Sequence, residues 1–265
     1  MNIPLDVIKL IASYLVEPKM KLLDWIPLDK INWKYLSKNP NAIDLLERNM
    51  DKIWWYFLSQ NPNAIHLLKQ DINMIEWSGL SMNPNAIHLF EQNIKKLDWD
   101  YVSENPNAIH LLQQNMDNIY WPALSMNPNA LKLLEENPDK IWWKYLSRNP
   151  NAIHLLQQNI DKIDWTNLSA NPNAIHLIQE NIDKIDWSEL SLNPNAISLL
   201  RENIDEIDWT YLSENPNAID LLHENMDKID WTWFFTNPSI FEINKNQLKI
   251  DIDDLAQIID KIIHQ

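Results

Sequence analysis

The sequence has no cysteine and only one glycine, Gly79. Without cysteine the chain cannot form disulfides, thiolate zinc sites, iron–sulfur clusters or a cysteine nucleophile. Phosphate-binding loops, dinucleotide-binding turns and nucleophile elbows need glycines where the backbone approaches a ligand or bends sharply. A chain with a single glycine is therefore not expected to contain these motifs, and most familiar enzyme classes are excluded.

Basic residues and long apolar runs are also scarce. The 22 Lys and Arg residues face 37 Asp and Glu residues, so the formal net charge is 22 − 37 = −15. Nucleic acid would be repelled by this charge, and no basic patch is evident. Asp6 and Lys9 interrupt the apolar N-terminus, so we predict neither a secretory signal nor a membrane span. We expect an intracellular protein without nucleic-acid or membrane partners.

Tryptophan recurs at an unvarying step of 22 residues through ten units, without insertions. The phased positions are 33, 55, 77, 99, 121, 143, 165, 187, 209 and 231. An Asn-Pro pair follows each of these tryptophans six residues later, so the unit is roughly WxxLSxNPNAIxLLxxNxDKID. A fixed period in the twenties predicts a solenoid in which each unit stacks on its neighbours.

Each unit is predicted to form two short helices. Asn is a good N-cap and Pro suits the first helical position, so one helix is expected to begin at Asn-Pro. In the unit at 149–159, the apolar residues fall on one side of that helix and the polar ones on the other. We expect Asn159 to end the helix in a left-handed conformation and Asp161 to cap the next helix, which carries Trp165. Such short helices are stable only when stacked.

The predicted fold class is therefore an all-α solenoid of about ten helix-turn-helix repeats with N- and C-terminal capping helices. We divide the chain into an N-terminal capping or F-box-like helix at 1–23, tandem repeats at 24–237 and a C-terminal capping helix at 238–265. A truncated unit surrounds Trp25, only eight residues before Trp33. At about 10 Å per unit, an open solenoid would have a contour of about 100 Å.

Several repeated residue types suggest chemistry but are better explained by structure. The tryptophans could stack on single-stranded nucleic acid, but each is followed three residues later by an apolar residue on the same helical face, which favours core packing. Five histidines share one repeat position with Asp, Lys and Ser, which favours solvent exposure over a metal ladder. The repeated aspartates are expected to cap helices, and the serine before each Asn-Pro to bond local backbone. We predict no catalytic residue, metal or cofactor.

The informative positions are those that vary between units. The second residue after the phased Trp is aromatic in six of ten units, and the fifth carries Met or Leu in three. We expect these positions to be exposed and to form a partner-binding face, although the aromatics could instead pack between units. The candidate residues are Tyr35, Phe57, Met82, Tyr101, Met126, Tyr145, Leu192 and Tyr211.

The Asn-Pro-Asn-Ala-Ile units resemble short tandem repeats found in proteins of large DNA viruses that infect amoebae and algae, over about residues 24–237. This resemblance implies a location in the host cytoplasm or nucleus. Separately, IPLDVIKLIASYL resembles the first helix of an F-box. That resemblance implies that residues near Pro4, Leu5, Ile8 and Ile11 recruit the linker subunit of a cullin ubiquitin ligase. A solenoid cap is the competing explanation for this helix, and it would turn the same residues onto the first repeat.

The sequence thus predicts a non-enzymatic repeat scaffold that binds a host or viral protein through its variable positions. The alternative is an F-box-like adaptor that recruits host proteins to a ubiquitin ligase.

Overall fold

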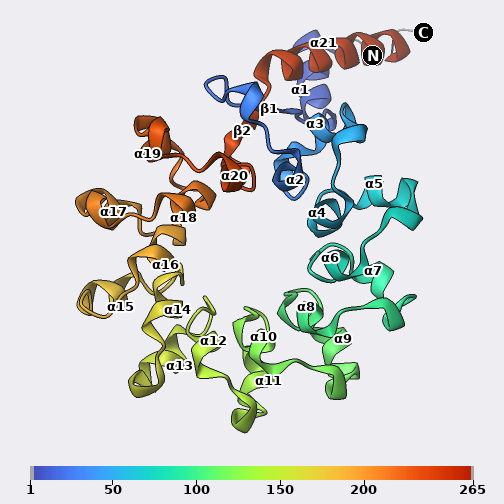
Figure 1. The fold of residues 1–265 in the computed structure, drawn as a ribbon. Coiled ribbons are helices and arrows are strands. Elements are labelled where there is room, and N and C mark those ends of the chain that lie inside the picture. The colour runs from blue at the N-terminus through green and yellow to red at the C-terminus, as the bar shows by residue number, and fades with distance from the viewer. Residues whose placement is uncertain (1–2, 264–265) are drawn as a thin grey trace.

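A computed structural model, which describes residues 3–263, confirms the all-α solenoid of short repeated helices. In each unit an inner helix begins at the phased Trp, and an outer helix follows the Asn-Pro-Asn-Ala turn. The units are arranged around a closed ring, with the inner helices lining its centre and the outer helices on its circumference (Figure 1).

The ten inner helices of the described residues are α2 (Trp33–Leu36), α4 (Trp55–Gln60), α6 (Trp77–Ser81), α8 (Trp99–Glu104), α10 (Trp121–Met126), α12 (Trp143–Leu146), α14 (Trp165–Ser169), α16 (Trp187–Leu192), α18 (Trp209–Glu214) and α20 (Trp231–Phe234). The nine outer helices are α3 (Ile43–Glu47), α5 (Ile65–Gln70), α7 (Ile87–Phe90), α9 (Ile109–Gln114), α11 (Leu131–Glu135), α13 (Ile153–Gln157), α15 (Ile175–Glu180), α17 (Ile197–Glu202) and α19 (Ile219–Glu224). In most units a single 3₁₀ turn, such as Ile160–Lys162, leads into the next inner helix.

The helix boundaries differ from the sequence prediction in their local chemistry. The outer helix begins after the Asn-Pro-Asn-Ala turn, because Asn149 Oδ1 accepts from the Asn151 N–H at 3.0 Å and closes the turn first. The left-handed conformation expected of Asn159 is wrong: its φ is −136° and ψ is 52°, and no described non-glycine residue has positive φ. Its side-chain amide donates instead to the Leu155 carbonyl at 2.9 Å, which satisfies the helix end.

Capping of the inner helix also differs from the prediction. Asp161 lies within a 3₁₀ turn, and Asp164 is the residue that caps α14, accepting from the Asn167 N–H at 2.9 Å. The position immediately before the phased Trp is therefore the N-cap.

The first asparagine of each Asn-Pro-Asn turn joins one unit to the one before it. In all ten units its side-chain amide donates to two backbone carbonyls of the preceding unit, at 2.7 to 3.2 Å. Asn149, for example, is fully buried and bonds the carbonyls of Ser125 and Asn127. The second asparagine adds an exposed bond, as from Asn151 to the Pro128 carbonyl.

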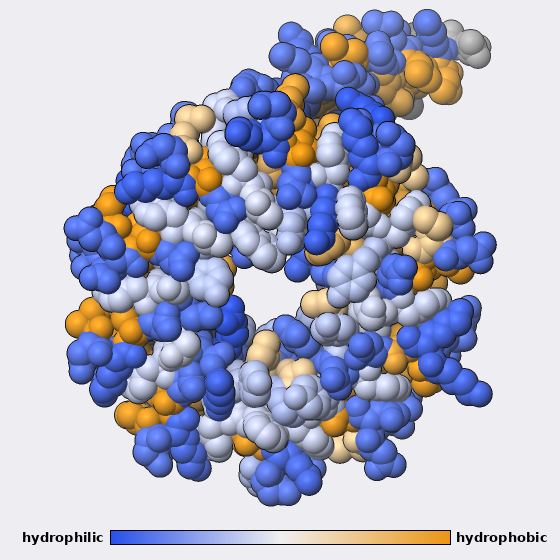
Figure 2. Space-filling view, viewed as in Figure 1, coloured by the Kyte–Doolittle hydropathy of each residue, from blue (hydrophilic) through white to orange (hydrophobic). Residues whose placement is uncertain are grey.

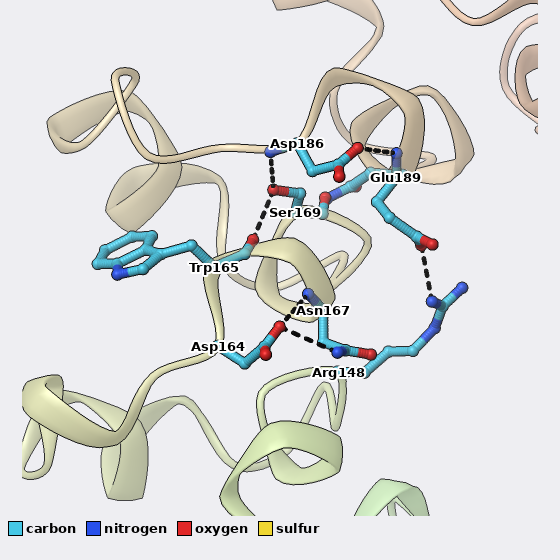
Figure 3. A network of polar contacts seen from close by, with 8 residues as sticks. Arg148, Asp164, Trp165, Asn167, Ser169, Asp186 and Glu189 are labelled. Atoms are coloured by element: carbon cyan, nitrogen blue, oxygen red, sulfur yellow. Dashed lines mark hydrogen bonds and ion pairs between the residues drawn. The ribbon is translucent and has the colours of Figure 1, made fainter.

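The serine before each Asn-Pro bonds local backbone, as predicted, and also contacts the start of the next inner helix. Ser169 Oγ donates to the Trp165 carbonyl at 2.7 Å and accepts at 2.9 Å from the N–H of Asp186, the N-cap of the next inner helix (Figure 3). The same pair of bonds is made by nine serines of the chain. Each hydroxyl thus has a structural partner on both sides.

Between the two helical layers runs one continuous apolar core, formed by the repeated Ala and Leu positions and the Ile that ends each 3₁₀ turn. The phased tryptophans are half-buried and pack against it, which supports the core-packing prediction. The lysine 19 residues later in the same unit covers five of them, with Nζ 4.3 to 4.8 Å from the ring centroid. Each of these five tryptophan rings is therefore held both by apolar packing against the core and by a cation–π contact.

The first and last units are joined by the same bonds as any other neighbours. Asn39 Nδ2 donates to the carbonyls of Phe235 and Asn237, at 3.1 and 2.8 Å, and Asn41 Nδ2 donates to the Pro238 carbonyl at 2.9 Å. These partners occupy the positions that the repeat would assign to a preceding unit. The solenoid is consequently a closed ring and not the open rod of about 100 Å contour that stacking alone suggested.

The tenth unit is completed by the N-terminal segment. After α20 the chain forms β2 (Phe241–Ile243), which pairs antiparallel with β1 (Met20–Leu22), so this unit lacks an outer helix of its own. Trp25 packs in that region, with its ring stacked on His223 at 4.7 Å and 5.8 Å from Phe234. The 3₁₀ turn Leu28–Lys30 stands 22 residues before its counterpart Met50–Lys52. The truncated unit seen in the sequence therefore supplies the missing half of the last one.

The two terminal helices pack on each other and do not cap opposite ends of an open solenoid. α1 (Leu5–Leu15) buries Ile8 and Ala12 against Ala256 of α21 (Lys245–Ile263), and Lys9 pairs with Asp253 at 2.7 Å. They form a small second core outside the ring (Figure 1), because a closed ring leaves no free unit end to cover. No helix in residues 3–263 is long and apolar enough to span a membrane.

Replacing Asn149 by Ala should lower stability more than replacing Asn151. The first change removes the amide donor from two buried carbonyls, at about 1–3 kcal/mol for Ser125 and less for Asn127, which keeps the bond from the Ala130 N–H at 3.1 Å. Asn151 loses one exposed bond worth about 1 kcal/mol. Asn149→Asp should be worse still, because a carboxylate would face two carbonyl oxygens. Urea midpoints measured for the three variants test this order, and equal midpoints for Asn149→Ala and Asn151→Ala would contradict the role of the buried amide.

Small-angle scattering should give the dimensions of a ring. A straight rod of about 100 Å has a radius of gyration near 30 Å, and a compact chain of this length about 18 Å. We expect a value between about 18 and 25 Å, together with the distance distribution of a body with a central opening. A radius near 30 Å would show that the first and last units are not joined in solution.

Candidate functional site

The variable positions predicted to bind a partner lie on the inner helices, which surround the centre of the ring. On an inner helix, the phased Trp and the residue three positions later face the core, so the second and fifth residues after Trp lie on the opposite side. For a helix of the inner layer that side is the central channel. Figure 2 shows the opening through the ring.

All eight predicted binding residues lie on this channel face, contributed by α2, α4, α6 with its C-cap residue, α8, α10, α12, α16 and α18. The structure brings them around one space, although they are spread over 177 residues of sequence from 35 to 211. They are half-buried and not exposed as expected: Tyr35, Phe57, Met82, Tyr101, Met126, Tyr145, Leu192 and Tyr211. Neighbouring inner helices pack closely on the channel side of the ring. At other variable positions Gln60, Gly79 and Ala170 are even buried.

Aromatic residues of neighbouring units touch along the channel and across the closure. Tyr35 lies 5.4 Å from the Phe57 ring in the next unit and 4.6 Å from the Trp233 ring in the last unit. Lys34 Nζ stands 5.2 Å from the Tyr35 ring and 5.4 Å from the Phe57 ring. Packing between units, the alternative for these aromatics, is therefore real in this sector.

Where a unit carries a small residue on this face, its neighbours close the gap in different ways. At Gly79 the helices approach so closely that an added Cβ would lie 2.5 Å from the Tyr56 carbonyl oxygen, which explains the single glycine. In the sector of Asn167, Arg148 reaches past one unit to Glu189 and pairs with it at 2.7 Å (Figure 3).

A third gap stays open at Ala123, which lies between Tyr101 and Tyr145 at the same repeat position. The result is a cavity of about 380 Å³ between α8, α10 and α12. Its lining also includes Met126, Tyr120 and the acidic residues Asp98, Asp100 and Glu104. A second cavity of about 200 Å³ lies between Met82, Tyr101 and Glu104.

Charges converge in the channel. Desolvation by the surrounding ring raises the pKa of Glu104, even though its side chain is exposed to the channel, while the charges of Arg148 and Lys38 lower that pKa. Desolvation likewise raises the pKa of Glu214, against a hydrogen bond from Thr236 and the charge of Lys38. The charge of Lys38 in the first unit thus acts on carboxyls of the fourth and the ninth units.

Sequence reasoning missed a set of aromatic residues immediately before the phased Trp. Five units place a capping Asp there, with bonds such as Asp208 Oδ1 to the Thr210 N–H at 3.0 Å. Three units instead expose a large ring and make no side-chain cap: Trp54, Tyr120 and Trp142, at 54%, 45% and 52%. Giving up a cap costs about 1 kcal/mol. In the sequence, these three aromatic residues could have been recognised because they replace the Asp that usually stands before the phased Trp.

The outer surface carries the repeated histidines, and the prediction of solvent exposure is confirmed for them. His66, His88, His110, His154 and His176 are exposed on the outer helices. His66 pairs with Glu47 at 2.9 Å and His176 contacts Gln157 at 3.1 Å. Within residues 3–263 no group of three His, Cys, Asp or Glu is arranged to hold a metal ion.

No family model, curated protein or solved structure matches the chain. The resemblance of the repeats to those of large DNA viruses therefore stays a prediction.

Proposed function

We propose that the protein is a non-enzymatic binding ring that holds an extended segment of another protein in its central channel. The observation that carries this proposal is the convergence of the eight variable residues on one channel face. Half-buried aromatics provide anchors of the kind that dominate protein interfaces, and methionines such as Met82 and Met126 adapt to different side chains.

The channel favours an extended segment over a folded domain. The opening that the inner helices surround is small compared with the ring as a whole (Figure 2). An extended chain could contact several units in succession, because the same positions recur around the ring.

A binding role agrees with the state of the polar groups. The nine repeated serines each donate to one backbone group and accept from another, so they support the fold and are poor candidates for nucleophiles. The net charge of −15 disfavours a nucleic-acid strand in the channel. We place the protein inside the cell, with a host or viral protein as partner.

Selection of random linear peptides on the immobilised ring tests the proposal. Peptides that occupy the channel should lose about 2 kcal/mol or more of binding free energy with the double variant Tyr101→Ala and Tyr145→Ala. The matched double variant on the outer helices, Gln113→Ala and Gln157→Ala, should bind them unchanged. Isothermal titration on variants with verified melting curves gives the comparison.

Two results would contradict channel binding. Selected peptides could respond equally to both double variants, which would place the binding surface elsewhere. The second concerns folding. If the Tyr→Ala variant does not fold, Tyr101→Phe with Tyr145→Phe, which keeps the rings, should fold and still bind the peptides. Failure of this variant to fold would show that the tyrosines are core residues and would contradict channel binding.

A second function, the ligase adaptor, is favoured by one observation on α1. Its apolar residues divide between two sides: Ile8 is buried against α21, whereas Leu5, Leu10, Tyr14 and Leu15 are 54% to 82% exposed. Among the residues of the F-box-like motif, Pro4 and Ile11 are also exposed and Ile3 is half-buried. Apolar residues gather on the terminal helices in Figure 2. Exposure of this extent on one helix is typical of a docking surface.

The adaptor function predicts that the purified linker subunit of a cullin ubiquitin ligase binds the protein through α1. Leu10→Glu should abolish that binding without changing the melting temperature, because Leu10 is 54% exposed. Leu28→Glu, at a leucine that is 74% exposed outside α1, is the control and should bind normally. Absence of binding by the unaltered protein in surface plasmon resonance would eliminate this function.

A further inference from the structure

The cavity at Ala123 is a gap of about 380 Å³ that the inner helices leave open on the channel side. Its position follows from three successive units, which place Tyr101, Ala123 and Tyr145 at the same repeat position. A methyl group thus stands between two phenol rings. The comparable gap at Gly79 is closed by backbone approach, and the one at Asn167 is bridged by the Arg148–Glu189 pair.

The walls of this cavity combine aromatic rings with carboxylates. Tyr101, Tyr120 and Tyr145 provide three phenol rings. Asp98, Asp100 and Glu104 provide three acidic groups, and no basic residue lines the cavity. The electron-rich π faces of aromatic rings and the carboxylates attract the same kind of ligand, an organic cation.

The two basic residues whose charges act on Glu104 do not line the cavity. Arg148 pairs with Glu189 at 2.7 Å, so its charge is shared between that carboxylate and Glu104, on which it acts from a distance. Lys38 acts on Glu104 only through its charge, from the first unit. The Asp98 carboxylate accepts one bond, from the Asp100 N–H at 3.2 Å, which leaves acceptor capacity for a ligand.

We infer that this cavity binds a basic side chain, an arginine guanidinium or a lysine ammonium, of the segment held in the channel. This inference rests on the proposed function and names the chemistry that one arc of the channel recognises. A basic side chain has an alkyl stem for Met126 and a charged head for the phenol rings and carboxylates. The same ring would discriminate against acidic segments, because three carboxylates stand at this position.

The probe is a blocked pentapeptide, Gly-Gly-Arg-Gly-Gly, and its matched control carries citrulline, which has nearly the same shape without the charge. ¹³C-methyl labelling of methionine reports on the cavity through Met126, whose signal is assigned by Met126→Leu. We expect the arginine peptide to shift the Met126 signal to saturation and the citrulline peptide to bind at least about tenfold more weakly. Peptides with lysine or trimethyllysine in place of arginine distinguish the two sources of the cation.

Three variants locate the site. Asp98→Asn with Glu104→Gln should weaken the arginine peptide about tenfold or more, and Asn keeps the helix cap. Ala123→Tyr should abolish binding by filling the cavity with the residue type found in the neighbouring units. Glu214→Gln removes a channel carboxylate at the same repeat position as Glu104, outside the cavity, and should leave binding unchanged.

Equal binding of the arginine and citrulline peptides would overturn the inference, as would equal weakening by Glu214→Gln, which would indicate general attraction to an acidic protein. The peptides selected on the ring separate this inference from the proposed function. If the selected peptides bind the channel and bind the Ala123→Tyr variant equally well, the proposed function is supported and the basic-residue site is contradicted. If no selected peptide depends on Tyr101 and Tyr145, channel binding itself falls.

Discussion

A buried asparagine amide that donates to two carbonyls of the preceding unit sets the geometry on which the whole structure depends. The two bonds of Asn149, to Ser125 and Asn127, hold one backbone turn against the next at a fixed distance and rotation. The amide group is shielded from water, where an unpaired donor would be costly, so neighbouring units have little freedom to tilt. Ten repetitions of one rotation bring the last unit back to the first.

Closure then determines how the ends of the chain are used. Asn39 can make its two bonds only if residues 235–238 stand where a preceding unit would be. The tenth unit therefore needs a second half, and Trp25 with the Leu28–Lys30 turn supplies it from the other end of the chain. Pairing of β1 with β2 and packing of α1 on α21 follow from the same meeting of the termini.

The period, the helical class, the core positions and the structural role of the serines could be predicted, because each depends on spacing within about one turn of helix. Asn159 was misjudged because two local solutions exist for a helix end, a left-handed backbone or a side-chain bond to the Leu155 carbonyl, and the sequence does not distinguish them. Ring closure was not predictable, since a small rotation per unit, summed ten times, separates a ring from an open superhelix. The eight candidate residues were found by their variation, but their common channel and their half-burial depend on that closure.

In an open solenoid, a residue that varies between units meets solvent and at most its two neighbours. A ring turns its inner face toward itself, so the same substitution also changes the charge that acts on other units, as Lys38 does for Glu104 and Glu214. The small residues at 79, 123 and 167 illustrate this: a closer helix approach fills one gap, an ion pair bridges another, and the third stays open as a cavity. Outer positions escape this constraint and accept His, Asp, Lys and Ser alike. We therefore expect selectivity for a ligand to depend on those inner-helix positions, such as 79, 123 and 167, at which a unit differs from the other units.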